Sequence, residues 1–167
     1  MTREPQRERG DHGPGLGQPL LAARYGRVID ETVGWLEREM RDPAGGLYAA
    51  MDADSEGVEG KYFVWTPEQL AAVLDPEKAR LVTRCYDVRP DGNWQDPHGH
   101  GPQGASILHV IDRPQDEAEG RLLAAARAEL LAARRTRVPP GTDDKVLTAW
   151  NGLAITGLAE AGRLLGE

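Results

Sequence analysis

The chain has 167 residues, of which 40% are hydrophobic and 28% are charged, and its formal net charge is −7 at pH 7. This composition is typical of a globular domain that buries a core of its own. The negative charge argues against a surface for nucleic acid or for an anionic membrane, because both need a basic face. We therefore expect neither nucleic acid nor a membrane among the partners.

The single cysteine, Cys85, excludes an internal disulfide, a CxxC redox pair and a cysteine-rich zinc site. No run of the sequence approaches the ~20 apolar residues of a membrane span, and the N-terminal 19 residues lack the apolar stretch of a secretory signal. We therefore expect a cytoplasmic protein in which Cys85 is a small buried side chain.

The N-terminal half begins with residues 1–19, whose Gly, Pro, Arg and Glu content predicts a disordered segment before a single domain over 20–167. Apolar residues then recur at helical spacing, which predicts an amphipathic helix over 20–41 that ends at the turn DPAGG. The stretches LYAAMDAD and GKYFVW flank an acidic loop, and together they predict a short β-hairpin.

Two helices and a loop are predicted next from local signals. Residues 66–69, TPEQ, supply an N-cap, a proline in the first turn and a capping-box partner, so a helix should follow to residue 74. Asp75 and Pro76 repeat the start signal for a helix to about Tyr86. Residues 89–104 then form a long polar loop, and loops of that length are usually functional or mobile.

The C-terminal part predicts a short strand at ASILHV, an alanine-rich helix over 115–136 with a basic end, and a last helix to about Leu165. We expect Asp143 or Asp144 to cap this last helix. The fold class is therefore mainly α, with helices paired as αα-hairpins and with short β-hairpin insertions. No element follows the last helix to cover its apolar face, which predicts a piece of a larger architecture.

The stretch DADSEG carries three carboxylates, at Asp52, Asp54 and Glu56. Their alternation fits the first half of an EF-hand calcium loop, but Phe63 stands where that loop has its bidentate glutamate. On an extended strand the three carboxylates would share one face, and this arrangement favours acid/base chemistry by neighbouring carboxylates. The alternative is a solvated acidic turn whose carboxylates pair with Lys61 or with arginines.

A second stretch, TDDKVLTAWN, could supply partner carboxylates from Asp143 and Asp144 across a cleft. Backbone N–H groups at a helix start would also explain two aspartates there. The otherwise apolar last helix carries three residues that are unusual there, Lys145, Trp150 and Asn151. Trp150 is most simply a core residue, whereas a buried Asn151 must find hydrogen bonds, which a polar ligand would supply.

Metal binding has one further candidate, the pair His98 and His100 in the long loop. No third ligand stands at a useful spacing, so we expect no metal, and we expect no cofactor.

Three segments in order, GGLYAAMDADSEGVEGKYFVWTPEQL, GNW and PPGTDDKVLTAWNGLAI, resemble the bacterial and animal family of the spermatogenesis-associated thioredoxin-like protein. The resemblance covers about residues 20–165. It implies a thioredoxin-like domain followed by an (α/α)6 toroid similar to those of N-acylglucosamine 2-epimerases and six-hairpin glycosidases. This chain would then be an inner, partial portion of the toroid, without the thioredoxin-like domain.

The resemblance also implies a pocket lined by all three segments. The candidate catalytic residues are Asp52, Asp54, Glu56, Asp143 and Asp144, and the candidate ligand-binding residues are Trp65, Asn93, Lys145, Trp150 and Asn151. Epimerases with this toroid use histidines, and the three segments contain none, which favours a hydrolase-like or merely binding role. The leading hypothesis is acid/base chemistry on a carbohydrate by the Asp and Glu residues. Two alternatives stay open: a non-catalytic module that binds sugar or protein, and an inactive portion of the toroid.

Overall fold

The computed structural model describes residues 19–95 and 99–166. About half of these residues are helical, and the strands are short antiparallel pairs, so the fold is mainly α. The predicted disorder of residues 1–19 lies outside the described residues apart from Pro19, which begins a helix, and His98 also lies outside them. No helix in this part of the chain is long and apolar enough to cross a membrane.

The chain divides into two compact units, which are described separately. Unit 1 contains the described residues up to Ala49 and from Asp144 onward, and unit 2 is Ala50–Asp143. The elements in chain order are α1 (Pro19–Trp35), a π-helical turn (Leu36–Met40), β1 (Arg41–Asp42), β2 (Gly46–Leu47), β3 (Ala50–Met51), β4 (Asp54–Ser55), β5 (Val58–Glu59), α2 (Pro67–Val73), α3 (Pro76–Cys85), α4 (Glu117–Arg134), β6 (Thr142–Asp143) and α5 (Thr148–Leu165).

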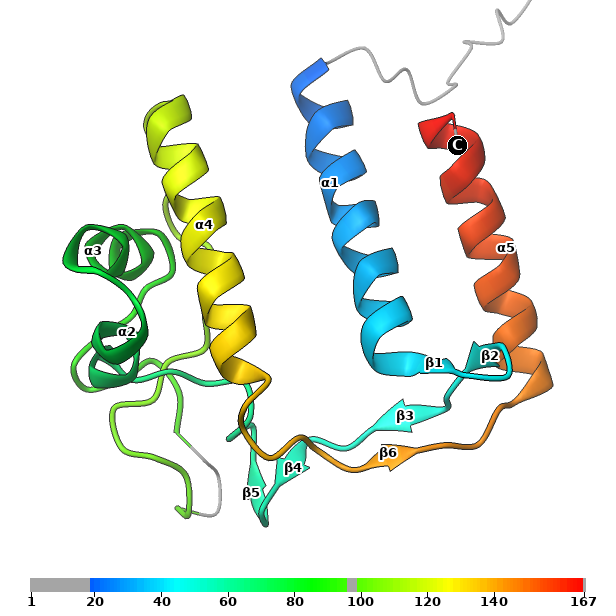
Figure 1. Ribbon diagram of the computed structural model, residues 1–167, viewed down its shortest axis with the longest axis horizontal. Coiled ribbons are helices and arrows are strands. Elements are labelled where there is room, and N and C mark those ends of the chain that lie inside the picture. The colour runs from blue at the N-terminus through cyan, green and yellow to red at the C-terminus, as the bar shows by residue number, and fades with distance from the viewer. Residues whose placement is uncertain (1–18, 96–98, 167) are drawn as a thin grey trace, which may run out of the picture. The chain divides into compact units, whose positions relative to one another are not determined.

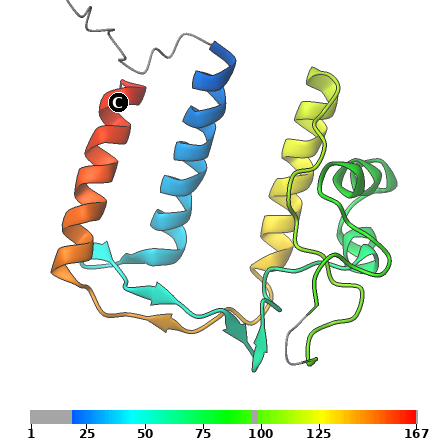
Figure 2. The ribbon, with the colours of Figure 1, turned by 180° about the vertical axis from the view of Figure 1, so that it is seen from behind.

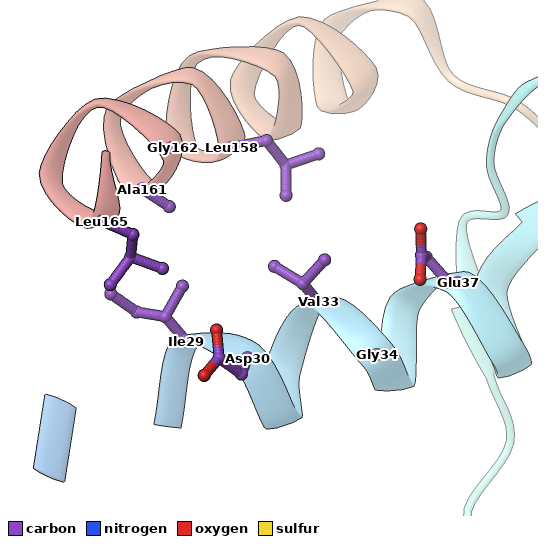
Figure 3. A pocket seen from close by; sticks show the side chains of 9 residues that line it. All are labelled: Ile29, Asp30, Val33, Gly34, Glu37, Leu158, Ala161, Gly162 and Leu165. Carbon is purple, nitrogen blue, oxygen red and sulfur yellow. The ribbon is translucent and has the colours of Figure 1, made fainter. Parts of the chain in front are cut away.

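In unit 1, α1 and α5 lie side by side and run antiparallel (Figures 1 and 2). The predicted helix over 20–41 is confirmed, but its last turn is π-helical before the DPAGG turn, around which β1 pairs with β2. Figure 3 shows Val33 of α1 pointing toward Leu158 of α5, across a groove of about 290 Å³ that is lined mostly by apolar side chains. The facing sides of the two helices are therefore mostly apolar, and Asp30 and Glu37 also line the groove.

Unit 2 contains the buried core, where α2 and α3 pack against α4 (Figure 1). The core residues are Trp65, Leu70, Leu74, Leu81, Val82, Cys85, Val88, Leu123, Ala126 and Leu130. The predicted starts of α2 and α3 are confirmed, with a complete capping box between Thr66 and Gln69 and with Asp75 as the N-cap of α3. Cys85 is fully buried, as predicted, and burial raises the pKa of its thiol.

The β-structure differs from the prediction. The hairpin consists of β4 and β5, inside the acidic stretch, rather than of LYAAMDAD and GKYFVW. From the first of these stretches, Ala50 and Met51 pair with β6 instead. The predicted strand ASILHV provides only a single bridge, between Ser106 and Trp65. Strands of two residues carry no alternation of apolar and polar side chains that a sequence pattern could detect.

The start of the last helix was predicted wrongly. Helix α5 begins at Thr148 after Leu147 and has no side-chain cap, so neither Asp143 nor Asp144 caps it. Asp143 is extended because its strand pairs with β3. Trp150, predicted to be a core residue, is 54% exposed. No residue of α5 is buried within the described part of the chain.

Candidate functional site

The end of the first acidic stretch nearest the N-terminus and the start of the second lie next to each other in unit 2, where residues 50–52 and 141–143 form a two-stranded antiparallel ribbon. Ala50 stands opposite Asp143 in the pairing of β3 with β6, and the N–H of Asp52 donates to the carbonyl of Gly141 at 2.7 Å. Opposite residues and residues two apart share a face of a ribbon, so Asp52 and Asp143 lie on one face, on a diagonal across the two strands. Asp52 is exposed and Asp143 is partly exposed.

The other two carboxylates of the first stretch belong to the next hairpin. A bend at Ala53 separates Asp54 from the ribbon, so no single strand places all three carboxylates on one face. The Glu56 carboxylate pairs with Lys61 at 2.8 Å, and Glu56 has a φ of 55° in the turn of the hairpin. Glu56 therefore matches the alternative interpretation, a solvated acidic turn closed by an ion pair.

Asn93 fixes the long loop through its backbone contacts. Its amide nitrogen donates to the carbonyls of Asp87 at 2.9 Å and Ile107 at 3.0 Å, and its amide oxygen accepts from the N–H of Ile107 at 2.8 Å. A Cβ on the preceding Gly92, whose φ is 78°, would lie 2.3 Å from the carbonyl oxygen of Ala105. The GNW segment thus closes the base of the loop.

Asn151 makes the hydrogen bonds that its position on an apolar helix requires. Its side-chain oxygen accepts from the N–H of Leu47 at 2.7 Å, and its side-chain nitrogen donates to the carbonyls of Leu47 at 3.0 Å and Leu147 at 3.1 Å. Backbone groups of unit 1 therefore occupy the hydrogen-bonding positions that a polar ligand was expected to use.

The aromatic run Tyr62–Trp65 is covered by arginines that the sequence analysis overlooked. Arg137 lies 4.0 Å from the centroid of the Trp65 ring and donates to the carbonyls of Tyr62 at 3.0 Å and Val64 at 2.8 Å. Burial lowers the pKa of Arg137. Arg134 lies 5.1 Å from the Tyr62 centroid. The signal in the sequence was the run of arginines at the end of the alanine-rich helix, because guanidinium groups stack on aromatic faces.

In unit 1, the phenol of Tyr48 has a raised pKa, which the sequence pattern does not predict. Partial burial raises the pKa of its phenol, and the neighbouring carboxylates of Asp42 and Asp144 add to the effect, with a hydrogen bond between Tyr48 and Asp42. Lys145 and Trp150 are both exposed. Tyr48 precedes the acidic stretch by four residues, so its place within the first motif was the available signal.

Metal binding finds no support in the described geometry. Within residues 19–95 and 99–166, no three His, Cys, Asp or Glu side chains are grouped so that they could hold one ion. Residues 60–63, where an EF-hand loop would run into its exit helix, form turns rather than a helix.

The chain is similar over most of its length to curated proteins of animals. Spermatogenesis-associated protein 20 of Homo sapiens is 32% identical over 170 residues, which cover 86% of the chain and 22% of that protein. The Mus musculus protein of the same name is 30% identical over 85% of the chain and 21% of its own length. An uncharacterised protein of Caenorhabditis elegans is 32% identical over 80% of the chain and 22% of its own length.

The chain thus spans about a fifth of the length of the curated relatives it matches. No family model matches it. The similarity confirms the homology to spermatogenesis-associated protein 20 that the three segments predicted.

Proposed function

We propose that this chain belongs to the family of spermatogenesis-associated protein 20 and contributes part of an (α/α)6 toroid that binds a carbohydrate in the cytoplasm. Homology over 86% of the chain supports the family. The function of a toroid depends on the residues at its site and not on the fold alone. The proposed ligand therefore rests on the residues of the β3–β6 ribbon.

The helices of unit 1 support the toroid. α1 exposes charged side chains such as Arg27 and Glu31 on the side away from Ile29 and Val33, which line the groove toward α5, and this is typical of an outer helix. In α5, Leu153 is 73% exposed and Ile155 is 68% exposed, although Leu158 faces α1. A helix that is apolar on several sides is usually buried within a larger structure. In the proposed toroid, α5 is an inner helix and α1 an outer one.

The observation that carries the proposed binding is the pairing of β3 with β6. It brings Asp52 and Asp143, far apart in sequence, onto one accessible face. Carboxylates that are exposed in pairs accept hydrogen bonds from the hydroxyl groups of a sugar, and charge-assisted bonds of this kind are the stronger ones. Asn93 and Asn151 bind backbone groups elsewhere and Trp65 is buried, so none of the three contacts the ligand in this proposal.

The spacing of the same pair favours a second candidate function, acid/base hydrolysis. Diagonal neighbours across an antiparallel pair lie about 7–8 Å apart at the backbone, and two aspartate side chains can bring their carboxyl groups to a similar separation. Carboxyl groups of inverting glycosidases are separated by roughly 6.5–9.5 Å, which leaves room for the attacking water. In this version one carboxyl protonates the leaving oxygen and the other activates water.

Thermal unfolding of the chain with a panel of monosaccharides and disaccharides tests the binding. A sugar that binds the folded chain raises the midpoint temperature. We expect this rise to disappear in Asp52→Asn and in Asp143→Asn. Glu59→Gln is the matched control, because it removes one exposed carboxylate from the neighbouring hairpin and should keep the rise.

Two outcomes would overturn the proposal. The first is that no sugar in the panel raises the midpoint. The second is a rise that both aspartate variants retain. Release of reducing sugar by the wild-type chain, lost in either variant, would favour hydrolysis over binding alone.

A further inference from the structure

We infer that unit 2, Ala50–Asp143, is an autonomous folding module that is inserted in the sequence between the two helices of a single helical hairpin, α1 and α5. The inference does not depend on the proposed carbohydrate binding. It rests on the distribution of burial, on the closure of the module by β3 and β6, and on the pairing of α1 with α5.

Burial is concentrated in unit 2. Among the side chains whose burial the structure describes, every buried apolar residue except Met40 belongs to this unit. Ten of them form one cluster contributed by α2, α3, α4 and the segments beside them. Leu70, Val82 and Cys85 are essentially inaccessible. A contiguous core of this kind is what allows a segment to fold by itself.

The chain enters and leaves unit 2 at adjacent positions. Ala50, the first residue of the unit, pairs with Asp143, the last, and Met51 pairs with Thr142. The buried hydroxyl of Ser55 adds a bond to the carbonyl of Val138 at 2.6 Å. An inserted domain needs termini that lie close together, because the two flanking ends of the host chain then stay close to each other.

The host has the form of one hairpin interrupted by the module. α1 and α5 pack antiparallel although the whole of unit 2 separates them in the sequence, and a Cβ on Gly26 of α1 would lie 3.5 Å from Leu165 of α5. Asn151 ties the start of α5 to β2, next to the point where the module begins. Unit 1 buries little, so α1 and α5 should open at a lower free energy than the core of unit 2.

Hydrogen exchange of the intact chain, followed by mass spectrometry, tests the inference with two matched truncations. Val82→Ala removes buried methyl groups from the core of unit 2. We expect it to accelerate exchange in α2, α3 and α4 together, by roughly tenfold or more, and to leave α1 and α5 unchanged. Leu158→Ala, on the side of α5 that faces α1, should accelerate exchange in α1 and α5 only.

A cross-strand cysteine pair tests the closure. Met51→Cys and Thr142→Cys stand opposite each other, at a spacing that an antiparallel pair makes suitable for a disulfide. The oxidised pair should slow exchange in α2, α3 and α4 and leave α1 and α5 unchanged.

Three results would overturn the module. The first is that Val82→Ala accelerates hydrogen exchange in α1 and α5 as much as in α4. The second is that exchange in α2 and exchange in α4 respond separately to this substitution. The two cysteines could also fail to pair in the folded chain.

Discussion

The polar side chains described above mostly make hydrogen bonds to main-chain groups. Asn93 and Asn151 each make three hydrogen bonds to main-chain groups, and Arg137 donates to three carbonyls while it covers Trp65. The sequence shows that a polar residue in apolar surroundings needs partners. It does not show which ones, because Leu47 and Asn151 are distant in the chain. The ribbon pair Asp52 and Asp143 therefore remains the candidate site.

Asp87 gives a prediction for pH at this scale. Its carboxylate is 12% exposed and accepts two hydrogen bonds from the Arg89 guanidinium, at 2.7 and 2.8 Å, with His109 at 3.8 Å. The hydrogen bonds from Arg89 are the main reason why the pKa of Asp87 is lowered. A lowered carboxyl pKa stabilises the fold above the unfolded value of about 4, and this stabilisation is lost as pH falls through the folded pKa.

The measurement is urea unfolding of the wild type and of Asp87→Asn between pH 7 and pH 3. The variant should be less stable at pH 7, and the difference in unfolding free energy should shrink toward pH 3. Asn tolerates the positive φ of this position as Asp does, so the backbone is matched. A difference that is equal at both ends of the range would contradict the ion pair.

At the scale of elements, the helices were predictable and the strands were not. The starts of α2 and α3 can be predicted from their N-cap residues, Thr66 and Asp75, because each cap is a local interaction within three residues. β3 and β6 are two residues long and pair across the whole of unit 2, so no local pattern marks them. The same long-range pairing explains why the predicted cap of α5 is wrong, because the pairing keeps Asp143 extended.

The capping box of α2 allows a prediction about one element. Thr66→Ala removes the hydroxyl that accepts the N–H of Gln69 at 3.3 Å. We expect the unfolding free energy of unit 2 to fall by about 1 kcal/mol. Thr83→Ala, at an exposed position inside α3, is the control and should change it by less than about 0.5 kcal/mol in either direction. Equal effects from both substitutions in urea unfolding would refute the role of the cap.

At the scale of the whole molecule, the sequence identified the homology but not the division into two units. The three motif segments predicted the relatives, because long ordered segments carry specific information. They did not predict that β3 and β6 enclose a separate core, since that depends on contacts between distant residues. An aromatic residue on an apolar helix predicts a core position for Trp150, yet its burial depends on what packs against that helix.

The central claim is that the β3–β6 ribbon is where a carbohydrate binds. Amide chemical shifts of the ¹⁵N-labelled chain, recorded while the same sugar panel is titrated, test it directly. The account predicts that the shifts which change most belong to residues 50–54 and 141–143, and that Asp52→Asn abolishes these changes. Changes confined to other residues, such as the loop at 89–95, or no change with any sugar, would contradict the claim.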